Sequence, residues 1–159
     1  MPKNQKGAIF LLRFTLGWLF FYAGITKVLN PDFSAAGYLA NAKTFTGFYT
    51  WLTSPGILPI TNFLNEWGLT LLGISLILGI GVRLSAKLGA LLMLLYYFPI
   101  LEFPYPNTHS FIVDEHLIYA AALFLLSTLP ASKAWGIGPW FSHFSLFSKS
   151  AKIRHWLEN

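Results

Sequence analysis

The sequence predicts an all-α fold, an integral-membrane four-helix bundle with an interfacial amphipathic helix between the first two spans. Of its 159 residues, 55% are hydrophobic and only 11% are charged, and the mean hydropathy is +0.55. Such a chain is far more apolar than an ordinary soluble domain. Its apolar runs also recur at lengths that suit membrane-crossing helices, which need ~20 residues for a hydrocarbon layer ~30 Å thick.

The first predicted span covers residues 8–29 and follows Lys3 and Lys6. It is longer than the apolar core of a signal peptide, contains Arg13 and lacks a clear small-x-small cleavage site. We therefore interpret it as a retained helix, which an Asn-Pro-Asp sequence ends.

The next segment, residues 33–53, is less apolar and predicts a helix at the membrane surface, where aromatic residues collect. On a continuous helix its aromatic stripe would face away from two polar residues. The stripe contains Tyr38, Phe45, Phe48, Tyr49 and Leu52, and the polar residues are Asn41 and Lys43.

Three further spans follow, each bounded by turn-forming or basic residues. They cover roughly residues 60–82, 86–103 and 109–129, and a basic, aromatic tail covers residues 131–159. We predict a single membrane domain over residues 1–159.

The distribution of cations predicts the orientation of this bundle. Most lysines and arginines fall on one side of a four-span arrangement, which the positive-inside rule assigns to the cytoplasm together with both termini. That side holds Lys3, Lys6, Arg83, Lys87, Lys133, Lys149, Lys152 and Arg154, whereas Lys27 and Lys43 lie on the other side.

The composition excludes several functions. The chain has no cysteine, which excludes disulfides, thiolate metal sites and Cys-ligated iron–sulfur clusters. Any redox chemistry must therefore use a bound cofactor or substrate. Membrane topology explains the net charge of +5, because the cations form no basic and aromatic patch for nucleic acid.

Ionisable residues gather at the outer end of the predicted bundle. An isolated charge at the bilayer centre costs at least about 2.5 kcal/mol, so these groups are expected to face one another or water. They are Lys27, Glu66, Glu102, His109, Asp114, Glu115 and His116. Arg13 alone is expected toward the inner leaflet.

Helical spacing places some of these residues on the same helix face as small residues, and we call each such face a stripe. The stripe of the first span is Arg13, Gly17, Phe20, Gly24 and Lys27, and that of the second is Glu66, Thr70, Gly73 and Ile77. His109 and His116 are seven residues apart, so they are predicted to share a face of the fourth span.

Structural explanations stay open for most of these residues. Asp114 and Glu115 would complement the dipole of a helix N-terminus, Lys27 would snorkel to the interface, and His109 would be an ordinary loop residue. The tyrosines would serve packing, although a phenol near the cluster could donate a hydrogen bond to a carbonyl ligand. The two histidines alone are weak evidence for a haem or a metal, and no metal site is predicted.

Two strings of the sequence define a motif in each of the first two spans. They are R-x3-G-x6-G-x2-K, from Arg13 to Lys27, and E-x6-G-x5-G-x3-R, from Glu66 to Arg83. With the acidic head of the fourth span, they resemble the DoxX family of four-helix membrane proteins over roughly residues 8–130. That family also includes the DoxD-type subunit of thiosulfate:quinone oxidoreductase.

The resemblance implies a multi-pass protein of a bacterial or archaeal cytoplasmic (inner) membrane, with redox links proposed for several members. It assigns the family's polar pattern to Arg13, Lys27, Glu66 and Glu115. His109 and His116 lie outside that pattern.

Two hypotheses of function follow. The first is a quinone-linked oxidoreductase subunit that exchanges protons through the outer cluster and depends on a partner redox subunit or a directly oxidised substrate. The second is a non-catalytic accessory or assembly protein, or a carrier of a small lipophilic ligand, whose charges only fix the helix arrangement. Membrane lipid is an expected partner in either case, and both hypotheses allow the protein to form a homo-oligomer.

For the first hypothesis we assign two sets of site residues. The catalytic set is Glu66, His116 and Asp114. The ligand-binding set is Arg13, Lys27, Tyr22, Tyr97, His109 and Glu115.

Overall fold

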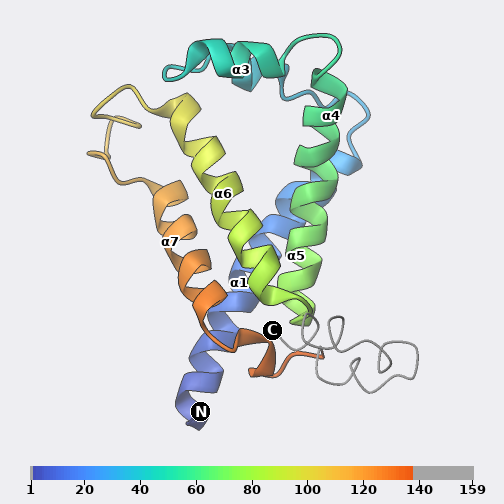
Figure 1. Cartoon of the computed structure of the whole chain (residues 1–159), viewed down its shortest axis with the longest axis vertical. Helices are drawn as coiled ribbons and strands as arrows, with labels where there is room; N and C mark the ends of the chain where they lie inside the picture. The colour runs from blue at the N-terminus through green and yellow to red at the C-terminus, as the bar shows by residue number, and fades with distance from the viewer. Residues whose placement is uncertain (1, 138–159) are drawn as a thin grey trace.

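The computed structural model describes residues 2–137 and is all-α in that range (Figure 1). The long helices are α1 (Lys3–Val28) and α6 (Val82–Ile100), and shorter ones lie between and after them. These are α2 (Ala36–Ala40), α3 (Thr46–Leu52), α4 (Leu58–Phe63), the π-helical turn η1 (Leu64–Gly68), α5 (Leu69–Leu78), α7 (Glu115–Thr128) and the 3-10 turn η2 (Ala131–Lys133). The predicted tail falls outside the described residues from position 138 onward.

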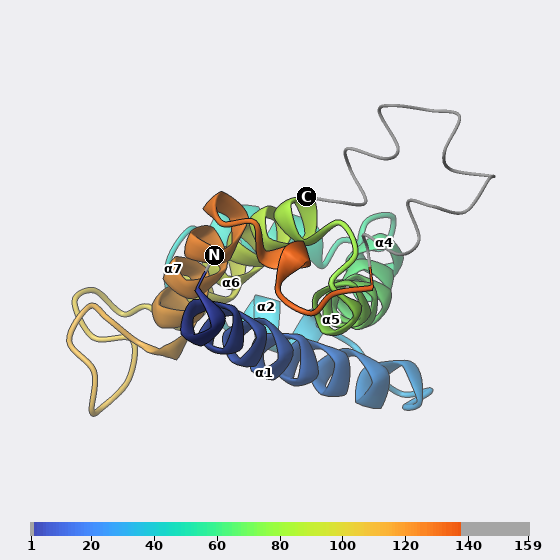
Figure 2. The ribbon, with the colours of Figure 1, turned by 90° about the horizontal axis from the view of Figure 1, so that it is seen from below.

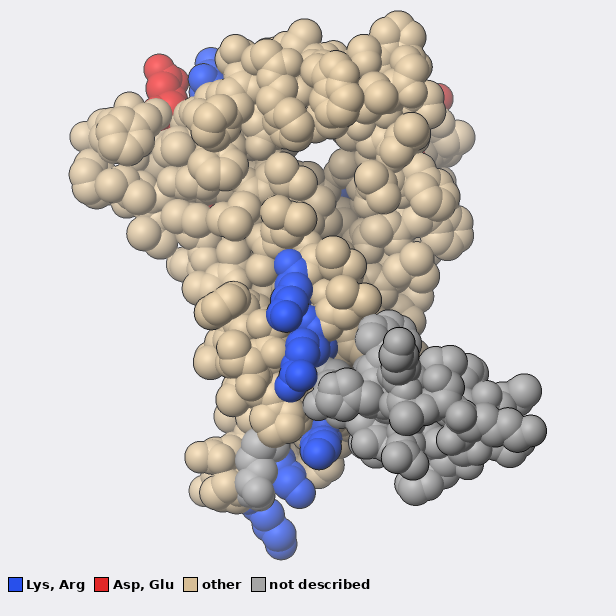
Figure 3. All heavy atoms as spheres, viewed as in Figure 1, with Lys and Arg blue, Asp and Glu red and all other residues tan. Residues whose placement is uncertain are grey.

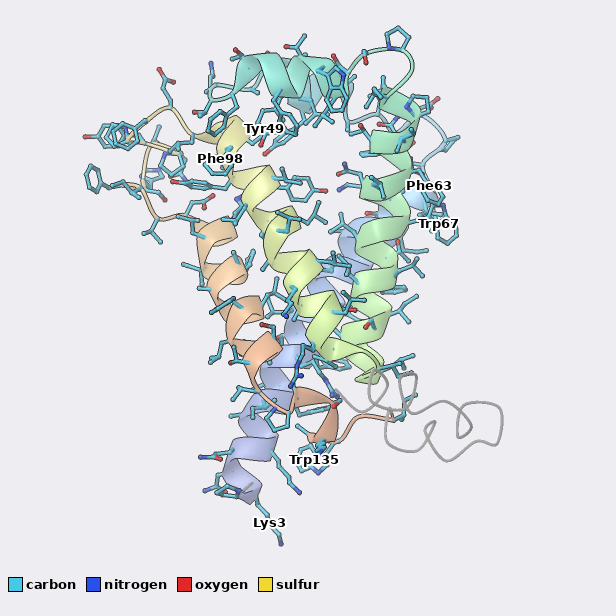
Figure 4. The ribbon with its side chains drawn as sticks, viewed as in Figure 1. Lys3, Tyr49, Phe63, Trp67, Phe98 and Trp135 are labelled. Atoms are coloured by element: carbon cyan, nitrogen blue, oxygen red, sulfur yellow. The ribbon has the colours of Figure 1, made fainter. Side chains whose placement is uncertain are left out.

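Helices α1, α5, α6 and α7 run along the long axis of the molecule, and α3 lies across one end (Figure 1). Viewed along that axis, α1 lies across one side of α5, α6 and α7 (Figure 2). The other end holds both ends of the described chain. There, the backbone N–H of Ile137 donates a hydrogen bond to Leu78 O at 2.9 Å, and the ring of Trp135 lies 5.4 Å from that of Phe10. We call the two ends the α3 end and the Lys3 end (Figure 4).

In the described part of the chain, two helices, α1 and α6, are long and apolar enough to cross a membrane, judged by length and composition. The second predicted span is split by η1, but the residues at both junctions keep right-handed helical dihedral angles. Residues 58–78 therefore follow one helical course with a π-helical turn inside it. Gly79, with φ of 74°, ends this course in the left-handed conformation that glycine adopts without strain.

Glycines let α1 and α5 approach closely. A Cβ atom at Gly17 would lie 2.9 Å from the backbone nitrogen of Ile77, and one at Gly73 would overlap the backbone of Phe21. A Cβ atom at Gly24 would likewise overlap Thr70. The small-residue stripes predicted for the first two spans therefore face each other, a pairing that the sequence did not specify; membrane helices commonly pack in this way.

The main core lies between α1, α5, α6 and α7. Its fully buried apolar side chains include Phe20, Leu76, Leu123 and Leu126. A second cluster attaches α3 to α6: Tyr49 is 1% exposed, donates a hydrogen bond to Leu95 O at 3.0 Å and packs near Phe98 (Figure 4).

The prediction that the fourth span starts at residue 109 is wrong, because α7 begins at Glu115. The preceding residues form turns with bridges between Glu102 and Tyr105 and between Asn107 and Ser110. Asp114 fixes the start of α7, because its side chain accepts hydrogen bonds from the backbone N–H groups of His116 and Leu117 as an N-cap. At 14 residues, α7 is roughly 21 Å long, shorter than a hydrocarbon layer of ~30 Å.

Smaller differences concern the other predicted boundaries. The single interfacial helix is in fact two short helices, because residues 41–45 are not helical and Phe45 has φ of 53°. The aromatic stripe predicted on a continuous helix is therefore broken, and Tyr49 is buried while Phe45 is 61% exposed. Helices α1 and α6 begin several residues before the predicted starts at 8 and 86.

Candidate functional site

A pocket of about 300 Å³ lies at the α3 end of the bundle. Residues from α1, α2, η1, α6 and α7 and from the segment before α2 meet in it. We call it the polar pocket. Its lining residues are Lys27, Phe33, Ser34, Ala35, Tyr38, Asn65, Tyr96 and His116.

Lys27 brings a cation to this pocket from the last turn of α1. Its Nζ atom lies 5.4 Å from the ring centroid of Phe33 and 5.5 Å from that of Tyr96, which is the range of cation–π attraction. Within residues 2–137, no carboxylate oxygen lies within the 4.0 Å of an ion pair with Lys27. Glu66 interacts with it electrostatically over a longer distance. The ammonium group therefore keeps hydrogen-bond donors for a ligand.

Asp114 and His116 form a coupled pair on the α7 side of the pocket. One carboxylate oxygen of Asp114 accepts hydrogen bonds from the backbone N–H groups of His116 and Leu117, at 3.0 and 3.2 Å, and so caps α7. The other oxygen lies 2.6 Å from His116 Nδ1. Asp114 is 4% exposed. This contact orients the imidazole and leaves Nε2 as the ring nitrogen available to a ligand.

A hydrogen-bond network fixes the opposite wall. The hydroxyl of Tyr96 donates to Asn65 Oδ1, and the hydroxyl of Tyr38 donates to the backbone carbonyl of Tyr96 at 2.6 Å. Burial raises the pKa of Tyr38 to about 12, with smaller contributions from Tyr49 and Asp114. Its hydroxyl therefore stays protonated as a donor. The Tyr96 ring meets the His116 ring edge-on at 6.2 Å, so the network reaches the coupled pair.

Sequence reasoning missed Asn65, Tyr38 and Phe33 as pocket residues and treated Tyr96 as packing. The π-helical turn η1 changes the register of the second span at Asn65, and single π turns of this kind are frequent at functional sites. The sequence shows no signal for such a turn. Phe33 and Tyr38 reach the pocket because the segment after α1 folds back over its end.

The structure disperses several residues of the predicted site. Glu66 is half-buried on η1 and does not line the pocket. His109 and Glu115 are exposed, and Tyr22 is 61% exposed. Tyr97 is buried, but its hydroxyl donates to Ile112 O at 2.5 Å. The prediction that His109 and His116 share a helix face is wrong, because His109 precedes α7 and is not helical.

Arg13 lies near the Lys3 end, roughly 20 Å along α1 from Lys27. It is completely buried, donates a hydrogen bond to Ala131 O at 2.8 Å and lies 5.6 Å from the Phe10 ring centroid. Among the residues that the structure describes, its Nε and Nη2 atoms have no hydrogen-bond partner. The position near Gly79 also places the guanidinium at the C-terminus of α5, where the helix dipole favours a cation. Arg13 therefore joins α1 to the segment after α7 and is not part of the polar pocket.

An apolar groove of about 630 Å³ lies between α5 and α6. Leucines dominate its lining, and two serines lie at its end nearest the turn between these helices. Within the described residues, no group of three or more His, Asp and Glu side chains is arranged to hold a metal ion.

The fold and the two sites define a class: a small, apolar, all-α protein with membrane-length helices and a polar pocket at one end of its bundle. Over residues 8–100, the chain matches the family model described as DoxX. Because this match covers more than half of the chain, the protein belongs to the DoxX family. The match ends before α7, so the pair of Asp114 and His116 lies outside it. No curated protein and no solved structure matches the chain.

Proposed function

We propose that the protein is a quinone-linked oxidoreductase subunit and that the polar pocket holds the quinone head group. The observation that carries this proposal is the arrangement of the coupled pair Asp114–His116 and the cation Lys27 around one pocket with aromatic walls.

The residues of the pocket fit a quinone ring in shape and in chemistry. A quinone is flat and apolar on its faces, and its carbonyl oxygens accept hydrogen bonds at opposite edges. Phe33 and Tyr96 provide aromatic walls, while Lys27 and His116 provide donors. The volume of about 300 Å³ is at the lower end of the range for small-molecule sites, which suits a head group alone.

Quinone reduction takes up two electrons and two protons. In this proposal a partner redox subunit supplies both electrons. His116 delivers the two protons one after the other from its Nε2 atom, and because its side chain is 21% exposed, it takes up a proton from water after each transfer. The carboxylate of Asp114 stabilises the charged imidazole between proton transfers. Lys27 stabilises negative charge that develops on a carbonyl oxygen.

Binding of a tailless benzoquinone to the purified protein tests this proposal. We expect Lys27→Met to weaken binding about tenfold or more, because a hydrogen bond to a charged donor is lost. Isothermal titration calorimetry in detergent measures the change. The matched control is Lys43→Met, which removes an exposed cation outside the polar pocket and should leave affinity unchanged. Protein that carries no quinone and binds none when it is added would instead support an accessory or assembly role.

We also propose that the protein crosses the membrane with the Lys3 end in the cytoplasm and the α3 end outside. Lys and Arg side chains gather mostly over the half nearest the Lys3 end, while Asp and Glu lie at the α3 end (Figure 3). This asymmetry is the one that the positive-inside rule requires.

Reporter fusions test this orientation. Fusions after Lys87 and Ala131 should report a cytoplasmic location, and fusions after Asn30 and Asn107 an external one. A cytoplasmic signal after Asn30 would contradict the orientation and place the polar pocket on the cytoplasmic side.

A further inference from the structure

The apolar groove and the polar pocket come together at η1 and the outer turns of α6. Leu64 and Leu95 line the groove, and their chain neighbours Asn65 and Tyr96 line the pocket. The hydrogen bond from Tyr96 to Asn65 joins the two helical segments at this junction. Figure 3 shows an opening below α3 in this region. One ligand can therefore place different parts in the pocket and in the groove.

The groove is long and open along one side. Leu64 and Leu78 are 14 positions apart in one helical course, which corresponds to roughly 20 Å. Leu71 and Leu91, on its two walls, are 58% and 56% exposed. A head group by itself cannot fill such a site, whereas a chain of several isoprene units can, and it can enter sideways from a bilayer.

At the end of the groove away from the polar pocket, the two serine hydroxyls already have hydrogen-bond partners. Ser75 Oγ and Ser85 Oγ are 2.6 Å apart, and Ser75 Oγ donates to Ile80 O at 2.5 Å. An apolar chain in contact with these serines leaves no hydroxyl unpaired, so it incurs no penalty for buried polar groups.

We infer that the groove binds the isoprenoid tail of a quinone whose ring occupies the polar pocket; this inference rests on the proposed function. A phospholipid is a poorer match for the pocket, because its cation Lys27 lies between two aromatic rings and the pocket has no arginine in its lining as described. Phosphate sites generally use arginine forks or clusters of backbone N–H groups.

A decyl-substituted benzoquinone with a photoreactive group at the end of its tail tests the inference on the whole chain in detergent. Mass spectrometry should locate the label on residues of the α5–α6 groove, such as Leu71 and Leu88. An excess of tailless benzoquinone should displace it, because the ring anchors the tail. If the tailless compound binds to the protein but the label of the decyl compound is found on α1 or α7, the tail site is overturned and the proposed function stands.

Label in the groove that the tailless benzoquinone does not displace would show adsorption of a lipid-like chain and would also overturn the inference. Failure of the tailless compound to bind at all would reject the proposed function itself. The arms of the experiment therefore separate the two proposals.

A matched pair of variants gives a second readout. Leu88→Trp fills the groove and should weaken binding of the decyl compound about tenfold while leaving the tailless compound unaffected. Leu125→Trp makes the same change on α7, at a similarly exposed leucine outside the groove, and should alter neither affinity. Equal effects of the two variants would contradict the assignment.

Discussion

Replacing Asp114 with Asn is expected to slow the reduction of a bound quinone by about 10²-fold, the lower end of what a positioned acid–base group contributes. The amide keeps the size of the carboxylate, and Asn is as good an N-cap as Asp, so α7 should remain folded. The variant loses the negative charge 2.6 Å from His116 Nδ1. Without that charge, the protonated imidazole is less stable and less well oriented.

The measurement uses purified protein with bound tailless benzoquinone and dithionite as the reductant, followed by stopped-flow absorbance. Glu115→Gln makes the same carboxylate-to-amide change at the exposed neighbouring residue and should leave the rate within about twofold. Circular dichroism checks that both variants retain their helices. An unchanged rate in Asp114→Asn would reduce the role of Asp114 to capping.

Replacing Gly73 with Ala should lower the free energy of unfolding by about 2 kcal/mol or more. The added Cβ would overlap the backbone nitrogen and Cα of Phe21 on α1, and backbone atoms cannot rotate away as a flexible side chain can. The two helices would have to separate, which would loosen the buried contacts around Phe20 and Leu76. The melting temperature in detergent should fall by roughly 5 °C or more.

Gly68→Ala provides the control for this prediction. A Cβ at Gly68 would meet no atom of residues 2–137 within 4 Å, and Ala is the better helix former by ~0.5–1 kcal/mol. Its melting temperature should therefore stay the same or rise. Equal destabilisation by both substitutions would mean that lost glycine flexibility, and not close helix contact, explains the effect.

The sequence by itself determined the features that depend on composition and on helical period. Apolar runs predicted the long helices α1 and α6, and glycine spacing predicted a face for close packing on each of the first two spans. Both follow from local rules, because a helix repeats every 3.6 residues whatever it packs against. The same rules predicted that ionisable residues gather at one end and identified Lys27, Asp114 and His116 among them.

Only the tertiary structure decided which of these residues share a site. Glu66 and His109 have the right chemistry, yet η1 and the turns before α7 place both outside the polar pocket. Asn65 and Tyr38 have no motif, yet they line it because the chain folds back over α1 and makes a π turn. A pocket brings together side chains far apart in sequence, and their positions depend on backbone irregularities of one or two residues. Helical periodicity cannot predict such irregularities, because they are stabilised by contacts that exist only in the folded bundle.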